Sequence, residues 1–187
     1  MAPAAALRAE RSVLVLVDYQ ARLLPAIHQG EQVLAEALRL ADAARLLDVP
    51  VLGTEQNPAG LGPNVDALRQ RCASTLAKMH FDACEDGLPA LLARQGERPD
   101  VVIAGCEAHV CLLQTALGLR RAGQAVWVVA PACGSRRASD HALAMQRLRD
   151  AGASVVSAEM VFFEWLHHCR HPRFKEVLTL VKQAPVG

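Results

Sequence analysis

Residues 12–17, with the sequence SVLVLV, constrain the fold of this chain more than any other segment. The apolar residues after the serine do not alternate with polar ones, so a strand formed here has no face suited to water. Strands buried on both faces are typical of parallel sheets that are covered by helices on either side. The segment therefore predicts a parallel sheet in the interior of the protein, with Asp18 directly after its first strand.

The rest of the chain alternates between short apolar runs and longer segments with apolar residues at helical spacing. We expect further strands at 51–54, 73–78, 101–104, 126–130 and 154–157, helices at 31–47, 88–94, 110–121, 141–150, 160–166 and 174–181, and a Pro- and Gly-containing loop at 55–65. This alternation predicts an α/β protein: a three-layer α/β/α, doubly wound parallel sheet of about six strands, for which we adopt the order 3-2-1-4-5-6. Ligands bind such sheets beyond the carboxyl ends of the strands, where the strand order reverses, which here is between the first and fourth strands.

Composition and charge narrow the class of protein. The 187 residues predict a single domain over 1–187, with the Ala-rich residues 1–10 as a loose N-terminal tail. A net charge of +1 without a basic stripe weighs against nucleic acid, and apolar runs too short to span a bilayer weigh against a membrane. Because the first residues lack the features of a signal peptide, we expect a cytoplasmic protein whose six cysteines are mostly reduced thiols.

Two cysteines follow the strand predicted at 101–104, in the sequence AGCEAHVCLLQTALGL (104–119). Cys111 lies near the start of the next predicted helix, where amide groups and the helix dipole favour an anion and lower the pKa of a thiol. With an acceptor for its proton nearby, such a cysteine is an activated nucleophile. Position alone favours the alternative, a buried structural cysteine at a helix start.

A zinc site and a redox pair are further alternatives for the same stretch. Cys106, His109 and Cys111 would supply three zinc ligands, but a structural site needs four, and the spacing of His80 and Cys84 does not match. A redox pair favours C-x-x-C, whereas these cysteines stand in C-x-x-x-x-C. No glycine-rich turn opens a helix after the first strand, which weighs against a dinucleotide. We therefore expect neither a metal nor a cofactor.

Charged residues stand at the ends of two predicted strands. Asp18 follows the first strand, and Lys78 closes the strand predicted at 73–78. The carboxyl ends of parallel strands meet at one edge of the sheet, so Lys78 can pair with Asp18 there and hold an anion. Each residue also has an ordinary explanation, as a turn cap or as a solvated surface lysine.

Taken together, these segments resemble the isochorismatase-like cysteine hydrolases. The resemblance covers roughly residues 12–166, and the motifs that carry it are VLVLVDYQARLLPAI (13–27), LAKMHFDAC (76–84), IAGCEAHVCLLQTALGL (103–119) and VVAPACGSR (128–136). The loop TEQNPAGLGP (54–63) is similar to that of a subgroup, the isochorismatase-domain-containing proteins. The combination is specific to this family because Asp, Lys and Cys occur in this order, each within its own motif.

The resemblance implies a role for each of these residues. Cys111 would be the nucleophile, Asp18 the base that takes the thiol proton, and Lys78 the residue that orients Asp18 and stabilises negative charge. It also implies a cis peptide bond between Cys106 and Glu107, which aims the amides of Glu107 and Cys111 at a developing oxyanion. The residues expected around the pocket are Gln20, Phe81, Ala108 and His109.

This chain departs from parts of the superfamily pattern. At 54–57 it has Thr-Glu-Gln-Asn in place of the Asp-x-His through which nicotinamidases bind metal, so the resemblance implies no metal here. Many relatives have Thr-Asp where this chain has Ala108-His109, which changes the pocket wall. Known isochorismatases often lack the nucleophilic cysteine, so isochorismate is not the expected substrate.

The resemblance thus implies a metal-independent cysteine hydrolase of a small amide or related carbonyl compound, with a thioester intermediate on Cys111. The alternative is a non-catalytic, oligomeric binding or scaffold protein with the same fold, and a Cys111 pKa at or above about 8.5 would favour it. A homo-oligomer is implied in both cases. The apolar segment with Phe162, Phe163 and Trp165 would serve self-association or form the core face of a terminal helix.

Overall fold

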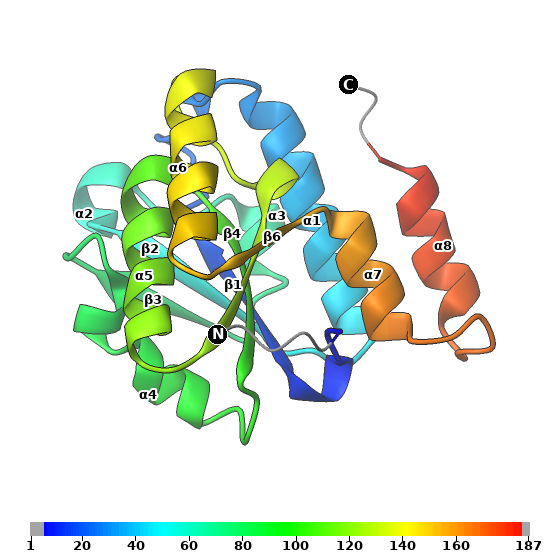
Figure 1. Ribbon diagram of the computed structural model, residues 1–187. Coiled ribbons are helices and arrows are strands. Elements are labelled where there is room, and N and C mark those ends of the chain that lie inside the picture. Colours follow the sequence, from blue (N-terminus) through cyan, green and yellow to red (C-terminus); the bar gives the residue numbers. More distant parts are fainter. Residues whose placement is uncertain (1–5, 185–187) are drawn as a thin grey trace.

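The computed structural model describes residues 6–184, which are built around a central parallel sheet (Figure 1). Its strands are β1 (Ser12–Val17), β2 (Val51–Gln56), β3 (Ser74–Lys78), β4 (Asp100–Gly105), β5 (Ala125–Val129) and β6 (Ser154–Val156). All neighbouring strands are parallel, in the order β3-β2-β1-β4-β5-β6. The predicted fold class and strand order are confirmed.

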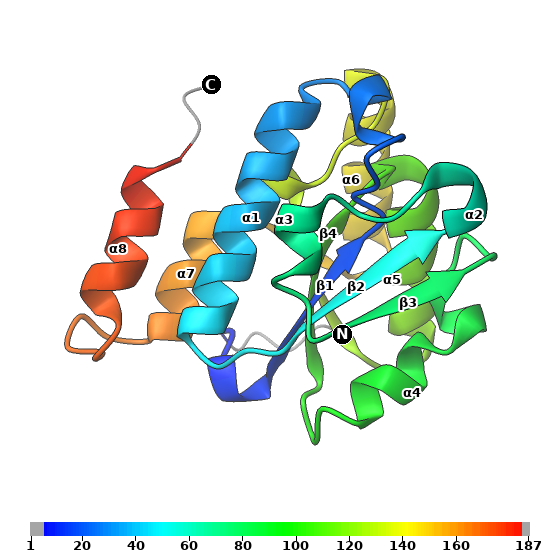
Figure 2. The ribbon, with the colours of Figure 1, turned by 180° about the vertical axis from the view of Figure 1, so that it is seen from behind.

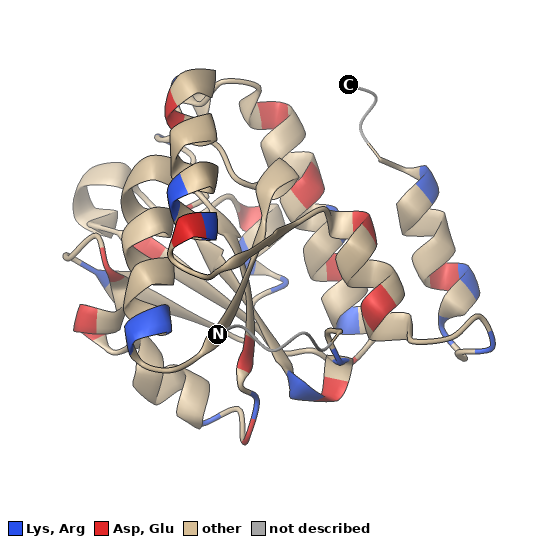
Figure 3. Cartoon of the chain, viewed as in Figure 1, with Lys and Arg blue, Asp and Glu red and all other residues tan. Residues whose placement is uncertain are grey.

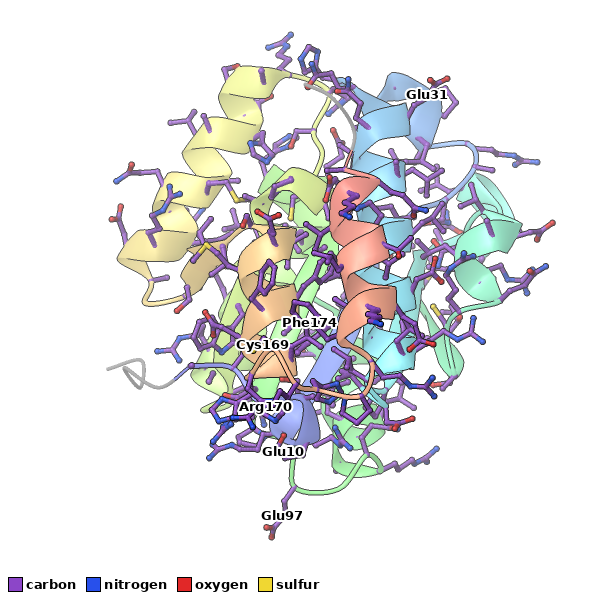
Figure 4. The ribbon with its side chains drawn as sticks, turned by 90° about the vertical axis from the view of Figure 1, so that its right-hand side faces the viewer. Glu10, Glu31, Glu97, Cys169, Arg170 and Phe174 are labelled. Atoms are coloured by element: carbon purple, nitrogen blue, oxygen red, sulfur yellow. The ribbon has the colours of Figure 1, made fainter. Side chains whose placement is uncertain are left out.

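Helices cover both faces of the sheet and give three layers (Figures 1 and 2). One face carries α1 (Gly30–Leu46), α3 (Asp66–Arg69) and α7 (Ala158–Leu166), and the other carries α4 (Leu88–Ala93), α5 (Leu113–Arg121) and α6 (Ala138–Asp150). The last helix, α8 (Phe174–Lys182), packs outside α1 and α7, and the loop before it carries Cys169 and Arg170 (Figure 4). Short helical turns at Ala9–Arg11, Leu24–Ala26, Pro58–Leu61 (α2), Ala83–Asp86, Ala108–Leu112 and Ala130–Ala132 complete the described elements.

The two central strands, β1 and β4, form the middle of the core because neither has a polar face. Every residue of both strands is buried. Gly105 closes β4 at a point where no side chain fits, since a Cβ there would collide with the backbone of Val17. The N–H of Cys106 then donates to the carbonyl of Val17 over 2.9 Å. This close approach brings the turns after β1 and β4 together at the carboxyl edge of the sheet.

Helix α7 explains most of the apolar C-terminal segment. Phe162 and Trp165 are buried, and the indole N–H of Trp165 donates to Ser12 Oγ over 3.0 Å. Phe163, on the other side of the helix, is 45% exposed. Two of the three aromatic residues therefore belong to the core, and Phe163 is exposed.

The expectation of a loose tail over residues 1–10 is wrong for the part that the structure describes. Leu7 is buried, and its N–H donates to the carboxylate of Glu164 over 2.6 Å. Ala9–Arg11 then form a 3-10 turn directly before β1. An apolar side chain that reaches the core, together with an acceptor on α7, fixes this segment. Residues 1–5 lie outside the described residues.

The expectation of a loop over residues 55–65 is also wrong in part. β2 continues through Glu55 and Gln56, because both pair with β3 in parallel register. Pro58–Leu61 then form the short helix α2, which begins at a proline. The extension of β2 matters for the site, because it carries Gln56 to the same edge as Lys78.

Positions of Lys and Arg are interspersed with positions of Asp and Glu along the ribbon in Figure 3. Among residues 6–184, no helix has both the length and the apolar character needed to cross a membrane.

Candidate active site

Asp18 begins the site at the carboxyl end of β1. It adopts a left-handed conformation (φ 54°), which aspartate tolerates better than most residues, and its side chain is fully buried. The hydroxyl of Thr54, at the neighbouring position of β2, donates to its Oδ1 over 2.6 Å. Thr54 thus fixes one oxygen of the carboxylate, and the other oxygen, Oδ2, faces Lys78.

Lys78 closes β3 and is brought to Asp18 across the sheet edge. Its Nζ lies 2.8 Å from Asp18 Oδ2, and both side chains have no exposed surface. The Lys78 ammonium therefore faces Oδ2 directly, while the Thr54 hydroxyl holds Oδ1. The ammonium also donates to Gln56 Oε1 over 2.5 Å. A buried lysine beside a buried carboxylate satisfies the rule that internal charges are paired.

Cys111 completes the cluster from the turn after β4. It lies in the π-helical turn Ala108–Leu112, is 6% exposed, and places its Sγ 3.7 Å from Gln56 Oε1. Burial raises the pKa of the Cys111 thiol to about 12; the negative charge of Asp18 adds to the rise, and the ammonium of Lys78 opposes it. The expected lowering of this pKa is therefore wrong, because burial and Asp18 outweigh the helix start. At neutral pH the thiol rests protonated.

The turn that carries Cys111 is fixed by several contacts. The peptide bond between Cys106 and Glu107 is cis. The carboxylate of Glu107 accepts bonds from the backbone N–H and the Nε of Arg136, over 3.1 and 3.0 Å. Cys106 is buried, and burial raises the pKa of its thiol well above the usual range. The N–H of Ala108 donates to the carbonyl of Gly134 over 2.7 Å, which joins this turn to the one after β5.

The four residues expected around the pocket have different surroundings. Gln20 is fully buried and braces β2: it accepts from the N–H of Gln56 and donates to its carbonyl. Phe81 is 50% exposed, and its carbonyl lies 3.5 Å from the Lys78 ammonium. Ala108 is fully buried, and its methyl side chain adds no polar group to the site. His109 contacts Ser135 Oγ through Nδ1 over 2.9 Å.

Sequence reasoning missed two members of the cluster, Thr54 and Gln56. Both lie on β2, two residues apart, so their side chains point to the same face of the sheet. A polar pair at the end of an apolar strand was the available signal. It was hidden because the segment after Thr54 contains the turn residues that predict a loop.

A cavity of about 310 Å³ lies between α1, the turn after β5 and α6, and its lining includes none of Asp18, Lys78 and Cys111. Its lining residues include His28, Ser135 and His141. His109 links this cavity to the cysteine turn through its contact with Ser135. Within residues 6–184, no group of three or more His, Cys, Asp or Glu side chains is arranged to hold a metal ion.

Fold and site together define a class of protein: a doubly wound α/β/α domain with a buried Asp–Lys pair and a cysteine at the sheet's switch point. The family model of the isochorismatase domain matches residues 12–160 of this chain. This chain belongs to that family.

Three proteins show what this chain is similar to in sequence and in structure. Human isochorismatase domain-containing protein 2 is 38% identical over 175 residues, which cover 92% of this chain and 83% of the relative. The structure of MAR1 ribonuclease from Caenorhabditis elegans is 33% identical, with a TM-score of 0.91, and the match covers 97% of this chain and 95% of that one. The YcaC gene product of Escherichia coli, described as an octameric hydrolase of unknown specificity, is 25% identical, with a TM-score of 0.84 and coverage of 99% and 100%.

Proposed function

We propose that this protein is a metal-independent cysteine hydrolase of a small amide or related carbonyl compound. The observation that carries the proposal is the buried contact of 2.8 Å between Lys78 Nζ and Asp18 Oδ2 beside the Cys111 thiol. Burying two ions costs several kcal/mol each before their attraction is counted. A hydrolase needs a base and a fixed positive charge at the ligand-binding edge of the sheet, and this pair supplies both.

The first half of the reaction forms a thioester. The Cys111 sulfur attacks the substrate carbonyl carbon while the thiol proton moves to Asp18, and the C–N bond then breaks. The amine leaves with the proton that Asp18 received. Asp18 suits this task, because its buried carboxylate acts on the Cys111 thiol and is held in place by Thr54 and Lys78. Lys78 stabilises the negative charge as it moves from the carboxylate towards the sulfur and the carbonyl oxygen.

The second half of the reaction hydrolyses the thioester. Water attacks the carbonyl carbon and gives a proton to Asp18, the C–S bond breaks, and the proton returns to the sulfur as the acid leaves. The N–H groups of Glu107 and Cys111 are the proposed donors to the oxyanion in both halves. Loss of one such donor typically costs about 2.7–4 kcal/mol of barrier.

The raised pKa of Cys111 favours the scaffold alternative if it is taken by itself. A thiol that rests protonated can still react when its proton acceptor is built into the site, because attack and proton transfer then occur together. Asp18 is that acceptor in the proposal. The reaction therefore does not depend on a stable thiolate.

Ribonuclease activity is the second candidate, because a structure 33% identical to this chain is described as a ribonuclease. The net charge of +1 and the mixed charges in Figure 3 do not favour it, since phosphate backbones are bound through clustered Lys and Arg. Amide hydrolysis remains the preferred function, with RNA included in the test below.

We also propose that the protein forms a homo-oligomer in the cytoplasm. The YcaC neighbour is described as octameric, and Met160 and Phe163 are about half exposed, at 49% and 45%, on one side of α7. All six cysteines are free, as suits a reducing compartment. Its mass in solution is the direct test of assembly.

The Cys111→Ala variant tests the function. A panel of small amides, with a structured RNA in parallel, is incubated with the natural protein, with Cys111→Ala and with the matched control Cys169→Ala in an exposed loop. We expect one or more amides to be hydrolysed by the natural protein and by the control, and turnover to fall at least 1,000-fold in Cys111→Ala, as for loss of a nucleophile. Full turnover in Cys111→Ala, or cleavage of RNA alone, contradicts the proposal.

A further inference from the structure

The side-chain carbonyl of Gln56 contacts both the cation and the nucleophile of the site. Its Oε1 accepts a hydrogen bond from Lys78 Nζ over 2.5 Å and lies 3.7 Å from Cys111 Sγ. The Gln56 residue is 9% exposed. One neutral oxygen is therefore shared between the ammonium and the thiol.

The orientation of the Gln56 amide is fixed by its neighbours. An ammonium only donates, so the atom that faces Lys78 must be the carbonyl oxygen. The amide nitrogen donates to the carbonyl of Met79 over 2.7 Å, which agrees with this assignment. Gln20 bonds both backbone groups of Gln56, over 2.9 and 3.0 Å. The oxygen therefore cannot turn away without breaking several contacts.

The charges around the Cys111 sulfur determine what the Gln56 oxygen does to the protonation of the thiol. Two charged groups act on Cys111: Asp18, from the turn after β1, opposes a thiolate, and Lys78, from β3, favours it. Glu107 and His109, on the same turn as Cys111, bond to Arg136 and Ser135 instead. Burial raises the pKa of this thiol most, and the position of the Lys78 ammonium, which opposes that rise, is set by its hydrogen bonds.

The Lys78 ammonium has four oxygen atoms as acceptors, so it does not need a thiolate at Cys111 as a further acceptor. Asp18 Oδ2 and Gln56 Oε1 lie at 2.8 and 2.5 Å, and the carbonyls of His80 and Phe81 complete the set at 3.3 and 3.5 Å. Of the two nearest acceptors, only Asp18 carries a charge. Gln56 thus satisfies the ammonium without placing a second negative charge beside the sulfur.

We propose that Gln56 is a positioning residue that keeps the Cys111 thiol protonated at rest, by giving the Lys78 ammonium a neutral acceptor in place of the thiolate. The role of this thiol as a nucleophile rests on the proposed function. A substrate that displaces the Gln56 oxygen frees one hydrogen of the ammonium. That hydrogen then stabilises the sulfur as its proton moves to Asp18.

Two substitutions at Gln56 test the proposal by shifting the reactivity of Cys111 in opposite directions. The rate of Cys111 alkylation by iodoacetamide is followed by peptide mass spectrometry from pH 7 to pH 10, without substrate. Gln56→Glu adds a carboxylate beside the sulfur, and we expect alkylation at a given pH to slow at least tenfold, as for a rise of one pKa unit. Gln56→Met removes the acceptor at similar volume, and we expect alkylation to accelerate by a similar factor. The control is Gln95→Glu, in the turn after α4, with an unchanged rate.

Equal rates in the natural protein and both variants, or shifts of the same sign in both, overturn the inference. Circular dichroism and thermal unfolding identify a variant that fails to fold. If Gln56→Glu does so, the acceleration expected in Gln56→Met decides alone. Because the readout needs no turnover, the inference and the proposed function fail separately. Loss of amide hydrolysis in Cys111→Ala without opposite shifts at Gln56 overturns only the inference, whereas opposite shifts without any hydrolysis contradict only the function.

Discussion

At the scale of single residues, the site depends on how each buried charge is satisfied. Asp18 has Thr54 on one oxygen and Lys78 on the other, and Lys78 has Gln56 as a further acceptor. Asp18 and Lys78 could be found from the sequence, because each stands where a predicted strand ends. Thr54 and Gln56 could not be assigned to them, because a side-chain hydrogen bond across two strands depends on register rather than on local pattern.

The Thr54→Val variant tests directly whether the Thr54 hydroxyl supports the buried Asp18 carboxylate. Valine has a similar shape but cannot donate to Asp18 Oδ1, so a buried carboxylate oxygen loses its partner. We expect the free energy of unfolding, measured by urea denaturation, to fall by about 1–3 kcal/mol, and amide turnover to fall with it. Thr54→Ser should restore most of both.

The control for this substitution is Thr179→Val on α8, where the hydroxyl is exposed and donates to the carbonyl of Lys175. Its effect should stay within about 0.5 kcal/mol. A Thr54→Val variant as stable and as active as the natural protein would show that the hydroxyl does not support Asp18.

At the scale of elements, the sequence predicts the strands better than the segments between them. Runs such as 12–17 and 101–104 have no polar face, so only a buried strand suits them. The turn Ala108–Leu112 differs, since helical spacing does not distinguish an α-helical start from a π-helical one. The expected pKa of Cys111 was wrong for a related reason: a helix start predicts a local field, whereas burial depends on all the elements packed around it.

Arg39 joins α8 to the rest of the molecule and provides a prediction at this scale. The buried guanidinium donates to the carbonyl of Leu180 over 2.9 Å, pairs with Glu36 at 2.5 Å, and lies 5.5 Å from the ring centre of Phe162. Arg39→Met keeps the apolar stem and removes these contacts. We expect faster hydrogen exchange in α8 and unchanged exchange in β1 and β4.

The matched control is Arg45→Met, at an exposed position of the same helix. It should leave the exchange of α8 unchanged. Equal acceleration in α8 and in the central strands of Arg39→Met would mean that the arginine stabilises the whole molecule instead of docking α8.

At the scale of the whole molecule, the buried thiols make stability depend on pH. Burial raises the pKa of Cys111 and Cys133 to about 12 from a reference value of 9.0. Below about pH 8 both thiols are almost fully protonated in the folded and unfolded chains, so they add little dependence. Between about pH 9 and pH 12 the unfolded chain loses these protons first, so the free energy of unfolding falls as pH rises, by up to about 1.4 kcal/mol per pH unit for each thiol.

Urea denaturation from pH 8 to pH 11, under reducing conditions, measures this slope. Cys133→Ala removes one buried thiol, so its slope should be shallower even if its stability at pH 8 is lower. Cys169→Ala, in the exposed loop before α8, should keep the natural slope. A slope that Cys133→Ala leaves unchanged would assign the loss of stability to other groups.

The sequence by itself determined the fold class and the family, with the strand order following from the family resemblance, and it marked Asp18, Lys78 and Cys111. It could do so because unbroken apolar runs and strand-end residues are local features that suit one architecture. Only the tertiary structure decided that Leu7 is buried, that Thr54 and Gln56 belong to the site, and that the Cys111 thiol rests protonated. These properties depend on burial and on distances between strands far apart in the chain, and no local pattern encodes either one.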